Sequence, residues 1–216
     1  MSEPTKRPRG CFFYGCMSGV VVLVLLLIGV LVGLHYLKKT LNQMTDSQPM
    51  PLPAVKLSPA EMDQVRARVD AFRQAVQAGR ATDPLTLTSD EINALIATDP
   101  DLQALKDKIY VTLEGDQVKG QLSVRLDQLG LAMFKNRYLN ASGTFSVSLN
   151  NGTLDFRAES IVVKGKPLPE VYMDKIRKQN LAQGVNQDPG SSAALGKLEQ
   201  IRVQDSKLVI VPKVGQ

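Results

Sequence analysis

The chain has 216 residues, a formal net charge of +5 and a pI near 9.2. Five of its 26 Lys and Arg residues but only one of its 21 acids, Glu3, lie in the first 40 positions, which leaves 21 basic and 20 acidic residues in the rest. A nucleic-acid-binding protein needs a basic face. This nearly neutral remainder, with no cluster of Lys and Arg, excludes nucleic acid as a partner.

The first element in the chain is an apolar run over 17–37 that contains no Asp, Glu, Lys or Arg. About 20 apolar residues in a helix cross the core of a bilayer. The sequence therefore predicts a single transmembrane helix over 17–37, after a short cytoplasmic N-terminus over 1–16. A cleaved signal peptide is the alternative, but its apolar core has about 7–15 residues and ends at a small-x-small site, which residues 35–39 (HYLKK) lack.

Three basic residues precede this run and two follow it. Because the more basic flank of a membrane helix tends to stay in the cytoplasm, this difference of one charge predicts an extracytoplasmic C-terminal domain at the cell membrane. Two G-x-x-x-G pairs, which begin at Gly15 and Gly29, have the spacing that lets membrane helices dimerise. Because glycine is common in membrane helices, a monomer stays the main expectation and a homodimer the alternative. Cys11 and Cys16 are candidates for acylation, although a pair of small interfacial residues is the simpler interpretation.

The residues after the apolar run argue against catalysis. The only histidine is His35 and both cysteines lie near the N-terminus, so the domain has neither a Ser-His or Cys-His pair nor a histidine-bearing metal site. We expect no cofactor and no metal. Two acidic pairs, Asp90/Glu91 and Asp99/Asp101, leave a carboxylate hydrolase as the lowest-ranked hypothesis. Helix capping is the favoured role for these acids.

A Pro-rich linker is predicted over 38–57, followed by one exported domain over 58–213. Prolines at alternate positions in 49–53 favour an extended spacer. The domain begins with a helix, because Ser58, Pro59 and Glu61 form the S-x-x-E start of a capping box and apolar residues follow at 3/4 spacing up to Gly79. A second, short helix begins at Thr88 with the same box and ends before Pro100.

From Ile109 onward the apolar period changes to two, which predicts antiparallel strands. The turns fall at 115–116 and at the Asn-Gly pair 151–152. A change of phase at 161–163 predicts a bulge or a strand buried on both faces. Further on we expect a helix over 170–183, a flexible loop over 184–192, a short helical piece, and a last hairpin over 201–211 that turns at 205–206. The fold class is α+β: amphipathic helices packed on one face of an antiparallel meander sheet.

Three segments carry a resemblance to known proteins: 87–96 (LTSDEINALI), 137–141 (RYLNA) and 165–169 (GKPLP). Together they resemble an uncharacterised family of single-pass, membrane-anchored bacterial envelope proteins, over most of residues 1–213. A more distant likeness is to tubular lipid-binding (TULIP-like) domains, and it rests on 87–96 and the strand order. That resemblance implies a curled sheet that wraps a helix around an apolar groove.

Two main functional hypotheses follow. The first is a non-enzymatic, membrane-anchored envelope protein that binds lipid or another hydrophobic ligand. The alternative is a scaffold that binds an envelope protein partner and has no ligand cavity. An apolar groove of several hundred Å³ between helix and sheet would favour the first. The apolar face expected to bind the ligand is formed by six residues: Val65, Val69, Phe72, Phe145, Val147 and Phe156.

Overall fold

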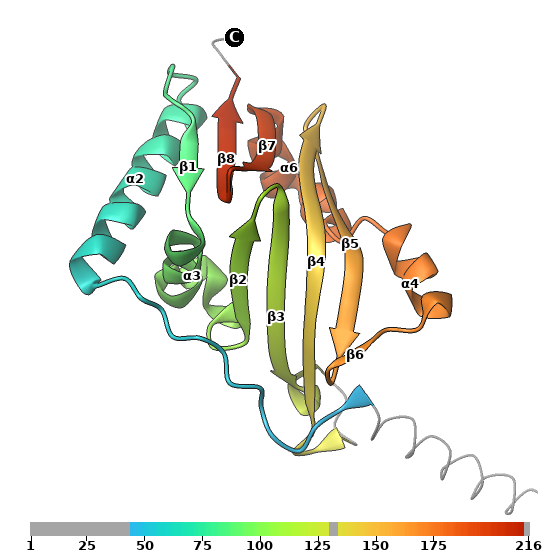
Figure 1. Cartoon of the computed structure of the whole chain (residues 1–216). Coiled ribbons are helices and arrows are strands. Elements are labelled where there is room, and N and C mark those ends of the chain that lie inside the picture. Colours follow the sequence, from blue (N-terminus) through green and yellow to red (C-terminus); the bar gives the residue numbers. More distant parts are fainter. Residues whose placement is uncertain (1–43, 130–133, 214–216) are drawn as a thin grey trace, which may run out of the picture. The chain divides into compact units, whose positions relative to one another are not determined.

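Two long strands joined by a tight turn, β4 (Tyr138–Asn150) and β5 (Thr153–Val163), run the length of the domain (Figure 1). The computed structural model describes residues 44–129 and 134–213. The other strands are β1 (Leu85–Leu87), β2 (Ile109–Glu114), β3 (Gln117–Arg125), β6 (Lys166–Pro167), β7 (Leu198–Gln204) and β8 (Lys207–Pro212). The helices are α2 (Pro59–Gln77), α3 (Ser89–Thr98), α4 (Glu170–Arg177), α5 (Gln183–Gln187) and α6 (Pro189–Gly196), with 3-10 turns η1 (Pro100–Leu105) and η2 (Leu126–Leu129).

All the described strands belong to one antiparallel sheet, in the order β1-β8-β7-β4-β3-β2, with β5 paired to β4 and β6 to β5. The register places apolar residues on one face: Leu113, Val118 and Phe145 lie side by side across β2, β3 and β4. Polar residues such as Lys119 and Thr144 share the opposite face. This alternation is typical of a sheet with one covered face.

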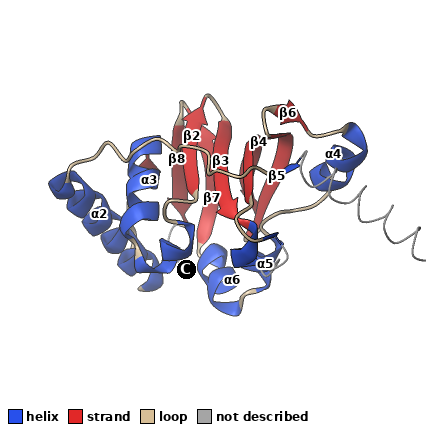
Figure 2. Ribbon diagram, turned by 90° about the horizontal axis from the view of Figure 1, so that it is seen from below, coloured by secondary structure: helices blue, strands red, loops and turns tan. Residues whose placement is uncertain are grey.

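Helices α2 and α6 pack on the apolar face at two places. Val65 and Val69 of α2 pack with Leu85 and Leu87 of β1, and Leu195 of α6 packs with residues of β4 and β7. Three residues of the last hairpin contact both clusters: Leu198, Leu208 and Ile210. The two clusters are therefore parts of one continuous core. Figure 2 shows α2 and α6 beside the same sheet.

Helix α3 is fastened to the edge strand β2 by two side chains. The Asn93 amide donates to the Val111 carbonyl at 2.7 Å and accepts from the Val111 N–H at 2.9 Å. The Ser89 hydroxyl accepts from the Leu113 N–H at 2.8 Å. These bonds replace the missing neighbour of β2 and protect its edge from pairing with another chain.

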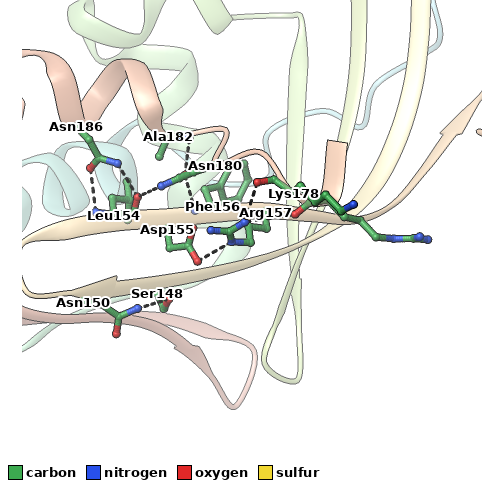
Figure 3. Close-up of polar contacts among 11 residues, drawn as sticks. Ser148, Asn150, Leu154, Asp155, Phe156, Arg157, Lys178, Asn180, Ala182 and Asn186 are labelled. Carbon is green, nitrogen blue, oxygen red and sulfur yellow. Dashed lines mark hydrogen bonds and ion pairs between the residues drawn. The ribbon is translucent and has the colours of Figure 1, made fainter. Parts of the chain in front are cut away.

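The edge of β5 is covered in the same way by α5 and the segment that precedes it. Asn180 and Asn186 both donate to the Leu154 carbonyl at 2.8 Å, and their amide oxygens accept from the backbone N–H groups of Phe156 and Leu154 (Figure 3). The Leu181 N–H donates to the Phe156 carbonyl. Side-chain amides thus take the place of a further strand.

Part of the predicted linker over 38–57 is held on the sheet. Arg137 donates to the Thr45 hydroxyl and carbonyl, and Asp46 pairs with Tyr138 through two backbone hydrogen bonds of 2.8 Å. The buried Asn140 amide donates to Asp46 and to the Gln48 carbonyl at 2.9 Å. The described residues from Thr45 onward belong to one compact unit.

The coarse fold prediction is confirmed: the domain is α+β with an antiparallel sheet and several helices. Both predicted capping boxes are present, and the turns at 151–152 and 205–206 have the positive φ angles that such hairpins require. The phase change in β5 is a bulge, because Ala158 pairs with Phe145 and Ser160 with Thr144, which leaves Glu159 without a partner in the ladder.

Two predictions in the C-terminal part were wrong. The expected helix over 170–183 ends at Arg177, where α4 stops, and the expected flexible loop over 184–192 contains α5 and the start of α6. Asp188 accepts from the Ser191 N–H and caps α6, and Pro189 occupies its first position. No described helix is both long and apolar enough to span a membrane, and the predicted span over 17–37 lies outside the described residues.

The Asn93 bridge generates a prediction about stability. Replacing Asn93 by alanine leaves the N–H and carbonyl of Val111 without partners, so the free energy of unfolding of the full-length protein should fall by about 2 kcal/mol. Asn150→Ala is the matched control, because Asn150 is exposed and its side chain donates only to the Ser148 hydroxyl, at 3.3 Å, within the described part of the chain. Thermal unfolding followed by circular dichroism should separate the variants; equal stabilities would contradict this role.

A second prediction concerns acid stability. Burial, the largest single effect, raises the pKa of Glu91, but the Thr88 N–H and the Arg68 guanidinium at 2.6 Å together hold this pKa below its usual value of 4.5. The charged form therefore stabilises the fold above pH 4.5, and this contribution is lost as the pH falls through the lowered pKa. Glu91→Gln, which keeps the cap, should cost about 1 kcal/mol at pH 7 and progressively less below pH 4.5. A stability difference between Glu91→Gln and the unchanged protein that stays constant between pH 7 and pH 3 would contradict this prediction.

Candidate functional site

The six residues predicted to bind a hydrophobic ligand lie in two groups. Val65 and Val69 are 5% and 6% exposed and pack in the core, and Phe72 lies one turn further along α2 at the edge of that core. Phe145, Val147 and Phe156 are half-buried on the apolar face of β4 and β5. Phe72 and the three sheet residues are thus nearer to solvent than the two valines.

Phe145 and Phe156 form an aromatic pair on the sheet. Their ring centroids are 5.1 Å apart, and the ring planes differ by 16°, which is a stacked arrangement. The Phe145 ring lies over Gly143, where a Cβ atom would be 2.9 Å from Phe145 Cζ and 2.8 Å from the Ser160 carbonyl oxygen. Glycine at 143 is therefore required for the ring to lie along the sheet.

A mainly apolar cavity of about 280 Å³ lies between α2 and α6, above the start of β7. Phe72 and Val76 line it from α2, Ala193 and Ala194 from α6, and Leu198 forms part of its floor. Both helices pack against the same hairpin but leave this space between them. We call it, together with the adjoining cavity described next, the α2–α6 cleft.

The second part of the cleft is a cavity of about 380 Å³ with three cations in its lining: Arg80, Lys197 and Lys213. Lys197 donates to the Gln77 carbonyl at 2.9 Å and Lys213 to the Gly196 carbonyl at 2.6 Å, so they offset the negative ends of α2 and α6. Among the lining residues of both cavities there is no Asp or Glu. We call this cationic part the mouth; an apolar cavity beside a cationic mouth suits an amphiphilic anion.

A larger cavity of about 640 Å³ lies between residues 49–55 and the β2–β3 end of the sheet. Its lining is mixed: apolar residues such as Ile96 and Ile109 face Lys106, Asp107 and Arg125. Arg125 is already paired with Asp127, in contacts of 2.5 and 3.1 Å. Because the lining includes Asp107, and because the Arg125 guanidinium is already paired, this cavity suits an amphiphilic anion less well than the cleft.

Two of the acidic residues considered for catalysis, Asp99 and Glu91, have structural partners. Asp99 accepts from the Asp101 N–H at the start of η1 and lies 3.4 Å from Arg73, and Glu91 caps α3. Within the described residues no three His, Cys, Asp or Glu side chains are placed to hold a metal ion. These positions support the favoured capping role for the acids.

Several cleft residues escaped the sequence analysis. Arg80, Lys197 and Lys213 come from three separate segments, and nothing in their local sequence indicates that they meet. Ala193 and Ala194 come directly after the segment expected to be a loop, in the short helical piece predicted there, and nothing marked them as lining a cavity. Only the 3/4 apolar stripe of the first helix, which includes Phe72, pointed to the cleft.

The Phe145–Phe156 pair generates a prediction. Gly143→Ala should force the ring or the facing backbone to shift, with a loss of stability of about 1–3 kcal/mol. Gly120→Ala is the graded control, since its Cβ would be 3.3 Å from Phe145 Cε2 and needs only a small adjustment. Near-ultraviolet circular dichroism and thermal unfolding should show the larger change for Gly143→Ala; the reverse order would contradict this packing.

A family model described as LmeA-like phospholipid-binding matches residues 44–211. Neither the curated proteins nor the solved structures gave a match. The family bears out the first functional hypothesis, non-enzymatic lipid binding, and nothing supports the scaffold alternative better. Because the match covers most of the chain, this protein belongs to the LmeA-like phospholipid-binding family.

Proposed function

We propose that this protein is a non-enzymatic phospholipid-binding protein that holds an anionic phospholipid in the α2–α6 cleft. The observation that carries the proposal is the pairing of an apolar cavity with an acid-free cationic mouth, in a chain of a phospholipid-binding family. Acyl chain burial supplies affinity, at about 0.8 kcal/mol for each CH₂ group removed from water.

The mouth offers donors for a phosphate group. Lys197 and Lys213 each use one N–H on a helix carbonyl and keep their charge and further donors. Arg80 is exposed and makes no ion pair within the described part of the chain. Three cations, one directly after α6, one directly after β8 and one in the segment after α2, therefore converge on one opening.

The rest of the proposal concerns location. The apolar run over 17–37 serves as a single-pass anchor, and the domain lies outside the cytoplasm.

A tubular, TULIP-like relationship belongs to the same proposal, supported by helices that pack on the apolar face of a long sheet. Dimerisation through the anchor stays a prediction.

A bulky residue in the cleft should block lipid. Ala194→Trp places an indole in the apolar cavity from an exposed position on α6, so it should reduce co-purifying phospholipid several-fold without unfolding the protein. Ala71→Trp is the control, because Ala71 is exposed on α2 and does not line the cleft. Native mass spectrometry of the detergent-extracted full chain measures the bound lipid. Equal lipid retention by both variants would refute the cleft as the site.

Neutralising one cation of the mouth should change which lipid headgroup the protein prefers. Arg80→Gln should weaken binding of fluorescent phosphatidylglycerol about fivefold, since a charged hydrogen bond at an exposed site contributes on the order of 1 kcal/mol. Binding of the zwitterionic phosphatidylcholine analogue should change less. Lys119→Gln, on the polar face of β3, is the control. Equal loss for both lipids would contradict anion recognition at the mouth.

A further inference from the structure

The α2–α6 cleft has an apolar end and a cationic end. Phe72 of α2 and Gly190 of α6 line the apolar cavity and not the mouth, whereas Arg80 lines the mouth and not the apolar cavity. Val76 and Lys197 line both, so the two cavities adjoin. A lipid whose phosphate lies at the mouth therefore directs its hydrocarbon chain towards Phe72.

The apolar cavity is narrow. Phe72 and Val76 are four positions apart, so they form a single row along α2. Arg73 and Gln77, which form the polar row beside it, also line the cavity and limit the width of its apolar wall. Leu198 lies in the floor and packs against both core clusters. One apolar row on this wall suits one hydrocarbon chain rather than two chains side by side.

The volume of the apolar cavity limits how much of this chain it can hold. The cavity measures about 280 Å³. An apolar protein cavity of about 150 Å³ holds one benzene molecule, which is roughly 25 Å³ for each carbon. On this scale the apolar cavity of the cleft holds about 11 carbons. A phospholipid with two chains of about 16 carbons carries roughly three times as much hydrocarbon.

We infer that the cleft binds one acyl chain over about 11 carbons, so that its preferred ligand is a single-chain anionic phospholipid, a lysophospholipid. This inference rests on the proposed function, because it names the class of lipid for the same cleft. A second acyl chain stays outside the cleft and adds little to the affinity. The protein thus selects a lipid by its number of chains as well as by its charge.

A series of lysophosphatidylglycerols with chains of about 8 to 16 carbons tests the limit on chain length. Native mass spectrometry of the full-length protein in amphipol measures each affinity. Each buried CH₂ group strengthens binding about fourfold, so the affinity should rise by this factor for each carbon up to about 11 carbons and by less than about twofold for each carbon beyond. Ala194→Trp, whose indole fills the apolar cavity, is the blank for binding to the amphipol.

A comparison at equal chain length counts the chains. Dioctanoyl-phosphatidylglycerol should bind no more than about threefold more tightly than the octanoyl lyso form, because the cleft has no apolar space for a second chain. Burial of the second chain would strengthen binding by more than about a hundredfold, and that result would overturn the inference.

The apolar end of the cleft can be moved. Phe72→Leu removes three carbons from this end, so the break in the series should shift to chains about two or three carbons longer. Val65→Ala is the matched control, because Val65 is buried on the same helix but does not line the cleft. The control should keep the break at about 11 carbons. An unchanged break in Phe72→Leu would contradict the assignment of this end.

The outcomes separate the inference from the proposed function. If no lysophospholipid binds the unchanged protein more tightly than Ala194→Trp, the cleft is not the lipid site and both fail. If lipids bind above this blank and the affinity rises without a break through the whole series, the inference is wrong and the proposed function stands.

Discussion

The first turns of α3 hold together the two ends of the sheet. Thr88, directly after β1, caps the helix, and Ser89 and Asn93 bond the backbone of β2, although β1 and β2 lie at opposite ends of the strand path. One short helix therefore connects two strands that no ladder joins. A second contact, from the Ser206 N–H to the Gly115 carbonyl, links the turn of the last hairpin to the β2–β3 turn.

This connection determines where the apolar face can be covered. Helix α2 lies on β1 and β8, and α6 lies on β4 and β7, so both contact the last hairpin from different sides. The α2–α6 cleft is the space that remains between them, and its mouth is where both helices end. Their C-terminal carbonyls attract the cations of Lys197 and Lys213. The same geometry thus produces the cavity and the charge beside it.

Local sequence patterns predicted those elements that are specified by residues close together in the chain. The capping boxes at Ser58 and Thr88 and the hairpin turns at 151–152 and 205–206 depend on residues within four positions of each other, and all are present. The strand β1 has only three residues and exists because β8 pairs with it, so no periodicity revealed it. Likewise the first half of α6 is rich in Gly and Ser, and this helix depends on the Asp188 cap and on the burial of Leu195.

The candidate site was less predictable than the fold for the same reason. An amphipathic stripe does not distinguish a core residue from a ligand contact: Val65 and Val69 are covered by β1, whereas Phe72 reaches the cleft one turn later. The cations at the mouth are brought together only by the pairing of β7 with β8 and by the end of α2. Side chains that meet through long-range pairing carry no local signal.

The position of the cleft along the sheet bears on the surface that a bound lipid would contact. The mouth of the cleft includes Gly196, which lies against Gly152 at the far turn of β4 and β5, while the chain enters beside Tyr138. These ends are about 40 Å apart along β4. The half-buried Phe145–Phe156 pair lies between the two ends, on the apolar face that the lipid would follow.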